Sequence, residues 1–304
     1  MKKDLPLVSL ITPCYNGAGH LRPYLNGVLH QTYPNVQYIF INDGSTDETE
    51  AIILSHKEPI EAKGWDFVYV KQENVGQATA VNNGLSLVKG KYFAQVDSDD
   101  IMYPHYLEKY CNFLETHPDC KFCYARVDFV NEDALGKIIL TRYRDIKDGK
   151  PDNFFNDLIL MKNVPPLPFY MVDTKAFFDV VKLPIFRGEG GQNWQILLPM
   201  AHKYKCGYID DILAKYVVRK NSHSHSRSNQ VQRTDDLKQI LFNTIARIDM
   251  PEGEKAFWHD KITTKYIQQK NKTKFRLFGF IPFLKIKGGW VYLFEFLPIG
   301  KIKG

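Results

Sequence analysis

Along the first 130 residues, short apolar runs alternate with longer segments in which apolar residues recur every three or four positions. The short runs predict buried β-strands, because a strand that is covered on both faces is apolar at every position. The longer segments predict amphipathic helices. Strands that alternate with helices are typical of a parallel sheet flanked by helices. The four predicted strands are residues 7–12, 36–41, 67–70 and 92–96.

Further elements are expected between and beyond these strands. The helix after the second strand is expected to start at residues 45–48, because Ser-Thr-Asp-Glu supplies a hydroxyl cap and acidic residues in the first turn. A polar loop is expected at 221–233. We therefore expect an α/β domain over residues 1–228 and a helical C-terminal region over 229–304. The remaining strands are expected at 121–130, 137–140 and 212–218, and the remaining helices at 153–161, 194–202 and 237–248.

Polar residues follow three of the predicted strands at the point where each strand ends. Residues 13–16 (Pro-Cys-Tyr-Asn) follow the first strand, 42–45 (Asn-Asp-Gly-Ser) the second and 97–100 (Asp-Ser-Asp-Asp) the fourth. In parallel α/β sheets, ligands bind outside the carboxyl ends of the strands. These three segments are therefore expected to form one ligand site.

Three carboxylates, those of Asp97, Asp99 and Asp100, lie within four residues. Carboxylates this close repel one another unless a cation or strong hydrogen-bond donors neutralise them. Mg²⁺ and Mn²⁺ prefer carboxylates together with substrate phosphates. An acidic turn that caps the next helix is the alternative, but the strand and helix pattern before the cluster favours a metal site.

Four segments in this order resemble the family 2 glycosyltransferases: residues 8–16, 31–34, 41–47 and 97–100. The resemblance is strong over about residues 5–130 and loose over 160–225. It implies a GT-A fold, with a Rossmann-like, mostly parallel sheet flanked by helices, and transfer of a sugar with inversion of the anomeric centre.

The resemblance also implies which residues bind the nucleotide. Asp43 would accept from the imide N–H of the base, which favours uracil. Asp97 would approach the ribose, and Asp99 would bind the metal between the two phosphates. Val81 stands where many members carry arginine, so one cationic contact is missing. The implied nucleotide-binding residues are Pro13, Tyr15, Asn16, Asp43, Asn74, Gly76, Asn82, Asp97 and Ser98.

The general base that inversion requires departs from the family pattern. Gln192 and Asn193 stand where a Glu-Asp pair is expected, followed by the aromatic residue Trp194. An amide cannot take up a proton, so Asn193 cannot be the base. Three alternatives remain: Glu189 is the base, Asn193 only orients the acceptor, or activity has been lost. Gln192 and Trp194 are candidate acceptor contacts.

A polar segment, residues 219–227, corresponds to a loop that in some relatives closes over the nucleotide and gives a histidine to the metal. The resemblance implies that Arg219 would suit the diphosphate. It also implies that His223 or His225 would coordinate the ion. A solvated loop without a ligand is the alternative interpretation.

The net charge of +6 over 304 residues comes from the C-terminal end, since residues 272–304 hold seven Lys or Arg and one acid. These residues also hold apolar and aromatic stretches, shorter than the about 18–20 apolar residues that span a bilayer. Lysines beside aromatics favour a segment in the membrane interface; packing on the domain is the alternative. Five cysteines and no visible signal peptide indicate reduced thiols in a cytosol.

These observations together predict a metal-dependent, inverting transferase of cell-surface polysaccharide synthesis. It would move a sugar from a UDP-sugar to a glycan or lipid-linked acceptor at the cytoplasmic face of the membrane, with no nucleic-acid partner. A silent relative that only binds nucleotide sugar or glycan is the first alternative. A nucleotidyltransferase would carry a basic, glycine-rich loop after the first strand, whereas residues 14–19 contain no Lys or Arg. A Rossmann dehydrogenase would carry GxGxxG there.

Overall fold

The computed structural model of the chain describes residues 5–142, 154–160, 169–186, 191–219, 230–277, 284–287, 290–293 and 297–301. By its internal contacts the chain divides into two compact units, residues 1–255 and 256–304. The first unit contains all the predicted site residues. The division expected at residue 228 stays a prediction.

The first unit is built on a nine-stranded sheet in the described part of the chain, in the order β3-β2-β1-β4-β8-β6-β9-β5, with β7 paired to β6. Strands β3, β2, β1 and β4 are parallel neighbours, as the alternating pattern predicts. The strands of this sheet are β1 (Val8–Cys14), β2 (Val36–Asp43), β3 (Asp66–Gln72), β4 (Tyr92–Gln95), β5 (Ile101–Met102), β6 (Cys120–Asn131), β7 (Ala134–Arg142), β8 (Tyr170–Asp173) and β9 (Lys205–Val218).

The sheet as a whole is mixed, which corrects the expectation of a mostly parallel sheet. Strand β8 runs antiparallel to β4 and to β6, and β5 runs antiparallel to β9, while β6 and β9 are parallel. The pattern along the chain did not predict β8, because the short apolar run at residues 169–172 does not distinguish a strand from part of a buried helix. This short strand joins the parallel half to the rest of the sheet.

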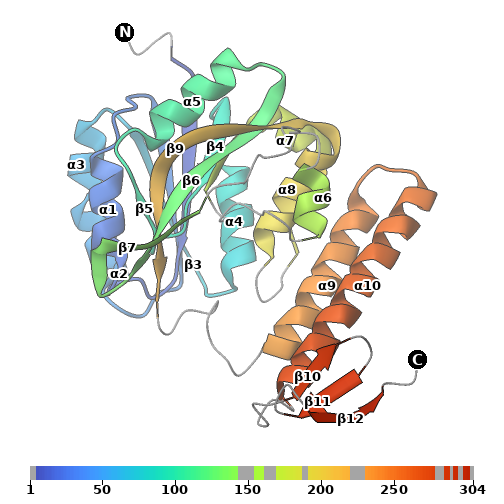
Figure 1. Cartoon of the computed structure of the whole chain (residues 1–304). Helices are drawn as coiled ribbons and strands as arrows, with labels where there is room; N and C mark the ends of the chain where they lie inside the picture. The colour runs from blue at the N-terminus through green and yellow to red at the C-terminus, as the bar shows by residue number, and fades with distance from the viewer. Residues whose placement is uncertain are drawn as a thin grey trace. The chain divides into compact units, whose positions relative to one another are not determined.

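Helices cover both faces of the parallel strands (Figure 1). Val8 and Leu10 of β1 belong to one core cluster with Leu25 and Val28 of the first helix. On the other face, Gly84 lies so close to Ile11 that an added Cβ would be 2.5 Å from its side chain, and this lets the fourth helix approach the sheet. The helices are α1 (Leu21–Leu29), α2 (Thr49–Ser55), α3 (Lys57–Ala62), α4 (Gln77–Ser86), α5 (Tyr106–Thr116), α6 (Phe154–Ile159), α7 (Thr174–Val180), α8 (Gln192–Lys203), α9 (Gln230–Arg247) and α10 (Glu252–Leu277).

Helix α2 begins at Thr49, later than the start predicted at residues 45–48. Asp47 accepts from the backbone N–H of Thr49 through Oδ1 and from that of Ala18 through Oδ2, each over 3.0 Å. The polar residues before the helix therefore bind the loop after β1, and this tertiary contact takes the place of the helical turn that their local pattern favoured.

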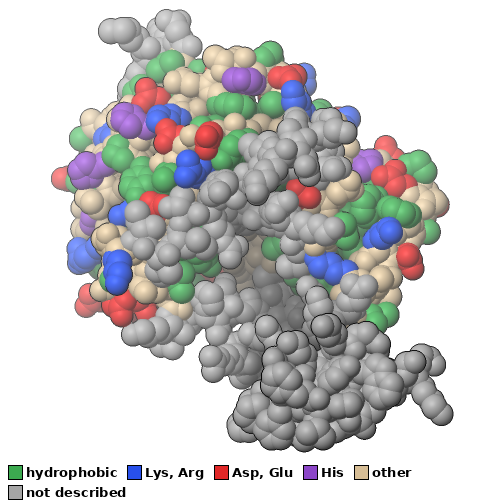
Figure 2. All heavy atoms as spheres, viewed as in Figure 1, with side chains coloured by type: hydrophobic (Ala, Val, Ile, Leu, Met, Phe, Trp, Pro, Cys, Tyr) green, Lys and Arg blue, Asp and Glu red, His purple; other side chains and the backbone are tan. Residues whose placement is uncertain are grey.

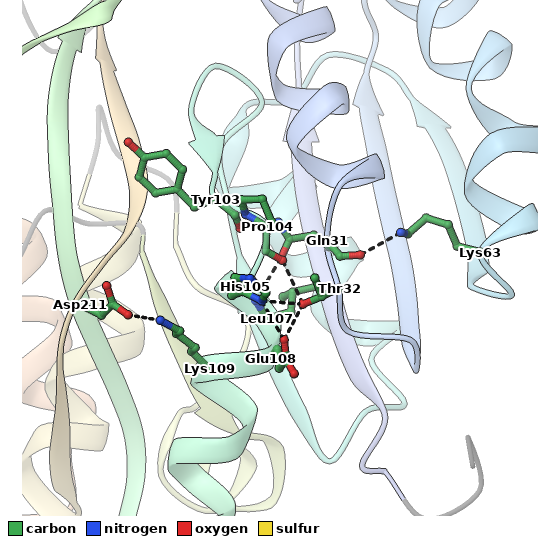
Figure 3. A network of polar contacts seen from close by, with 10 residues as sticks. All are labelled: Gln31, Thr32, Lys63, Tyr103, Pro104, His105, Leu107, Glu108, Lys109 and Asp211. Atoms are coloured by element: carbon green, nitrogen blue, oxygen red, sulfur yellow. Dashed lines mark hydrogen bonds and ion pairs between the residues drawn. The ribbon is translucent and has the colours of Figure 1, made fainter.

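The motif at residues 31–34 holds the end of α1 to the segment that follows the acid cluster (Figure 3). Gln31 donates to the carbonyl of Tyr103 over 2.7 Å and accepts from the backbone N–H of Leu107 over 3.1 Å. Thr32 donates to Glu108 over 2.6 Å. These contacts fix the path of the chain between the cluster and α5.

The second unit contains most of α10 and a three-stranded antiparallel sheet of β10 (Leu284–Lys287), β11 (Trp290–Leu293) and β12 (Leu297–Lys301). Among the described residues, no helix is both long and apolar enough to cross a membrane. On the face shown in Figure 2, the described acidic and basic side chains are interspersed, without a patch of one sign.

Candidate functional site

The loops that follow β1 and β2 are tied together by Asn16. Its side chain accepts from the backbone N–H of Thr46 over 2.9 Å, and its own backbone N–H donates to Ser45 Oγ over 3.0 Å. Asn16 has a positive φ of 49°, a conformation that asparagine tolerates better than most residues. Asn42 completes the junction by accepting from the backbone N–H of Ser45 over 2.9 Å. Two of the three predicted strand-end segments therefore meet.

Asp43 organises the turn after β3. Its carboxylate is 3% exposed and accepts from Gln72 Nε2 over 2.7 Å and from the backbone N–H groups of Val75 and Gly76 over 3.2 and 3.0 Å. Sequence reasoning missed this role, because the partners lie about 30 residues away. The contact between Asp43 and a nucleobase stays a prediction.

The carboxylates of Asp97, Asp99 and Asp100 gather directly after β4, with their ligand atoms within 4.8 Å of one another. Burial, followed by the charge of Asp99, raises the pKa of Asp97 to about 7. The same two causes hold the pKa of Asp100 well above its ordinary value. Crowded carboxylates with raised pKa values are stabilised when a cation neutralises them. The donor set therefore fits a divalent metal ion with oxygen ligands.

The members of the cluster differ in what else they bind. Asp100 is 2% exposed and accepts from the backbone N–H of Val217 over 2.9 Å, which ties the end of β9 to the cluster. Asp97 accepts from Gln77 Nε2 over 2.9 Å. Ser98 is buried and hydrogen-bonds the Cys14 thiol, whose pKa burial raises to about 11. Cys14 is therefore a protonated packing residue at this edge of the sheet.

Arg219, at the end of β9, lies at the cluster. Its Nη2 is 2.5 Å from Asp99 Oδ2, and its Nη1 donates to His20 Nδ1 over 3.0 Å. Burial, followed by the charge of Arg219, lowers the pKa of His20. Sequence reasoning singled out Arg219 but not its partners. His223 and His225, the predicted metal ligands, lie outside the described residues.

Asn193 contacts a residue that the sequence did not single out. The hydroxyl of Tyr170 donates to Asn193 Oδ1 over 3.0 Å. Tyr170 is 1% exposed, and its pKa is raised by burial and then by the charge of Asp97. The only signal for it along the chain is the apolar run at residues 169–172. The side chain of Tyr170 thus links Asn193, at the position where a base is expected, to strand β8 of the sheet.

Two other predicted residues have structural partners, and a third is buried. Asn82 bonds the backbone of Ile185 twice, donating to its carbonyl over 2.8 Å and accepting from its N–H over 2.9 Å. Trp194 donates to the carbonyl of Leu158 over 3.3 Å. Gln192 is buried at the start of α8. The ligand roles of these three side chains stay predictions.

The surface beside these loops is open at two predicted positions. Tyr15 is 49% exposed, so its ring is free to stack on a ligand. Gly76 has a φ of 95°, and a Cβ added to it would meet no atom within 4 Å. Asn74 is exposed and Pro13 is buried. Glu189 lies outside the described residues.

The sequence pattern described as Glycosyl transferase family 2 matches residues 9–179. An uncharacterized glycosyltransferase of Rickettsia prowazekii is 43% identical over 116 residues, which are 38% of this chain and 34% of that protein. The match therefore spans about a third of that relative's length. TuaG of Bacillus subtilis, provisionally named a teichuronic acid biosynthesis glycosyltransferase, is 27% identical over 231 residues, 75% of this chain and 86% of that protein.

Solved structures share the fold at low sequence identity. S. aureus TarS 1-349 in complex with UDP-GlcNAc superimposes with a TM-score of 0.64 at 17% identity, covering 86% of this chain and 72% of TarS 1-349. Mannosyltransferase PcManGT of Pyrobaculum calidifontis, in complex with GDP-Man and Mn²⁺, gives a TM-score of 0.59 at 18% identity, covering 86% of this chain and 70% of that one. The predicted GT-A fold is thereby confirmed. With a family pattern that matches more than half of its length, the chain belongs to the family 2 glycosyltransferases.

Proposed function

We propose that this glycosyltransferase moves a sugar from a UDP-sugar to a glycan or lipid-linked acceptor, with inversion of the anomeric centre. The observation that carries the proposal is the cluster of Asp97, Asp99 and Asp100 at the carboxyl end of β4. Strand β4 lies next to β1 in the sheet. Asn16 joins the loop after β1 to the loop after β2. Such an edge suits a nucleotide whose diphosphate reaches the carboxylates.

The proposed metal is Mn²⁺ or Mg²⁺, held by Asp97 and Asp99. When bound, such an ion supplies Lewis-acid stabilisation of the leaving diphosphate. The raised pKa of Asp97 supports the proposal, because burial, followed by the charge of Asp99, disfavours its charged form, and a bound cation would stabilise that form. PcManGT, which has the same fold, is described in complex with Mn²⁺. His223 or His225 remains the proposed additional ligand.

The proposed donor base is uracil. Asp43 would accept from its imide N–H, and the exposed ring of Tyr15 would stack on the base. Both oxygens of Asp43 already accept hydrogen bonds from the turn after β3, but a carboxylate offers about four lone-pair sites. TarS is described with UDP-GlcNAc and PcManGT with GDP-Man, so the two neighbours differ in their base.

The proposed general base is Glu189, with Asn193 orienting the acceptor. Asn193 is an amide, and the raised pKa of Tyr170 keeps that hydroxyl protonated, so neither takes a proton at neutral pH. The carboxylate of Glu189, which precedes α8 in the sequence, meets the chemical requirement. The amide at residue 193 and its bond to Tyr170 also support a second candidate, a silent relative that binds nucleotide sugar without transferring it.

We place the proposed reaction in cell-surface polysaccharide synthesis, at the cytoplasmic face of the membrane. The name of TuaG refers to teichuronic acid biosynthesis, which supports a polymer of this kind. The excess of basic residues in 272–304, seven against one acid, supports peripheral contact with an anionic membrane surface.

Release of UDP from a panel of UDP-sugars, with Mn²⁺ and without it, tests the proposal. We expect release with at least one donor, and loss of release when the metal is chelated. A protein that binds UDP-sugars in a thermal-shift assay but releases no UDP with any donor or acceptor would support the silent relative. Release of GDP from GDP-mannose, without release of UDP from any UDP-sugar, would replace uracil with guanine as the proposed base of the donor.

A further inference from the structure

The backbone of β9 brings Arg219 to the acid cluster. The N–H of Val217 donates to Asp100 Oδ1 over 2.9 Å, and this bond fixes the end of the strand beside the cluster. Two residues further along, Arg219 Nη2 lies 2.5 Å from Asp99 Oδ2. The side chains of Arg219 and Asp99 are 28% and 23% exposed, so the pair is partly shielded from water.

The guanidinium is incompletely satisfied in this position. Nη1 donates to His20 Nδ1 and Nη2 faces Asp99. Nε is buried and has no hydrogen-bond partner in the described part of the chain. A buried N–H without a partner costs free energy that an anionic oxygen would recover. The Nε–H group of Arg219 is therefore available to donate to a second anion.

We infer that Arg219 is an internal counter-ion of Asp99, which a divalent cation must displace before it can use that carboxylate. The inference rests on the proposed metal site. A guanidinium and a divalent ion repel each other, and Arg219 Nη2 already contacts Asp99 Oδ2, so the ion and the guanidinium compete for that oxygen. Once displaced, Arg219 gains a new partner only when a diphosphate is present. It thereby couples binding of the cation to binding of the nucleotide.

Isothermal titration calorimetry with Mn²⁺, with and without UDP, tests this coupling on the full chain. For the unsubstituted protein we expect weak binding of Mn²⁺ alone and stronger binding with UDP. Arg219→Gln removes the charge, so Mn²⁺ alone should bind on the order of tenfold more tightly, because a charged hydrogen bond no longer has to be broken. UDP should then raise the Mn²⁺ affinity less. Arg219→Met provides a second neutral side chain if the first variant does not fold.

Two further variants serve as controls. Arg219→Lys keeps the charge and should bind Mn²⁺ alone about as weakly as the unsubstituted protein does. Arg126→Gln removes an arginine whose ion pair, with Asp210, does not involve the cluster, and should change nothing. Equal Mn²⁺ affinity of the neutral variants and the unsubstituted protein without UDP would overturn the counter-ion role and leave the metal site standing. Absence of Mn²⁺ binding in every variant, even with UDP, would overturn both.

Discussion

The hydroxyl of Tyr170 donates to Asn193 Oδ1 over 3.0 Å and joins β8 to the first turn of α8. This bond holds the amide of Asn193 with its oxygen toward Tyr170 and its nitrogen away from it. The amide nitrogen then offers a donor to a bound molecule, and the amide itself does not take up a proton. Burial, followed by the charge of Asp97, raises the pKa of Tyr170. The same tyrosine is therefore coupled electrostatically to the acid cluster.

Tyr170→Phe should weaken use of the acceptor while leaving the nucleotide site intact. Loss of one hydrogen bond worth about 1 kcal/mol frees the Asn193 side chain and should lower kcat/KM for the acceptor by about fivefold. UDP affinity, measured by calorimetry, should stay the same. Tyr110→Phe is the matched control, since it removes a buried hydroxyl that bonds the carbonyl of Phe169 instead. An equal loss of kcat/KM in both variants would contradict a specific role for Tyr170.

Asp99→Ala should abolish metal-dependent binding of UDP while the protein remains folded. The substitution removes a proposed metal ligand and the partner of Arg219. We expect UDP to bind with the same low affinity with and without Mn²⁺. Asp211→Asn serves as the control, because Asp211 pairs with Lys109 away from the cluster (Figure 3). Retention of Mn²⁺-enhanced UDP affinity in Asp99→Ala would remove Asp99 from the site.

Asp43→Asn should destabilise the protein by about 1–3 kcal/mol, because an amide nitrogen would replace one of the oxygens that accept from Gln72, Val75 and Gly76. Urea denaturation measures the change. Asp66→Asn alters an acid whose pair with Lys89, 3.7 Å apart, is well exposed, and its effect should be small. A stability of Asp43→Asn equal to that of Asp66→Asn would show that the turn does not depend on this carboxylate.

Glu189→Gln should reduce turnover by 100-fold or more, on the order expected for loss of a general base. The affinity for UDP-sugar should not change, because the amide keeps the size and polarity of the side chain. Steady-state kinetics and calorimetry separate the two effects. Undiminished turnover would exclude Glu189 as the base and leave Asn193 as an orienting group only.

Removal of residues 272–304 should shift the protein from the membrane fraction to the supernatant in cell fractionation. The tail carries the excess positive charge, and contact with anionic lipid depends on it. Replacement of Lys285, Lys287, Lys301 and Lys303 by glutamine tests the charge without shortening the chain. This variant should leave the membrane at lower salt than the unsubstituted protein. Membrane retention of both variants would refute the anchor.

The parallel half of the sheet and the acid cluster at its edge were predictable from the sequence. Buried strands such as residues 7–12 and 36–41 show as apolar runs, and the inward positions of α1, among them Leu21 and Leu25, recur at helical spacing. Both signals are local. A carboxylate cluster directly after a strand is local as well, so Asp97, Asp99 and Asp100 could be identified together.

The partners of these residues were decided by the tertiary structure. Arg219 lies 199 residues from His20 along the chain, and Asn82 lies 103 residues from Ile185. Such pairs follow from the order of the strands, because β8 and β9 lie in the sheet beside strands that are distant from them in the sequence. Periodicity fixes which face of an element is buried, but it does not fix which other element covers that face. The sequence by itself therefore determined the acidic edge of the sheet. Only the fold decided that Arg219 lies beside Asp99 and that the hydroxyl of Tyr170 bonds Asn193.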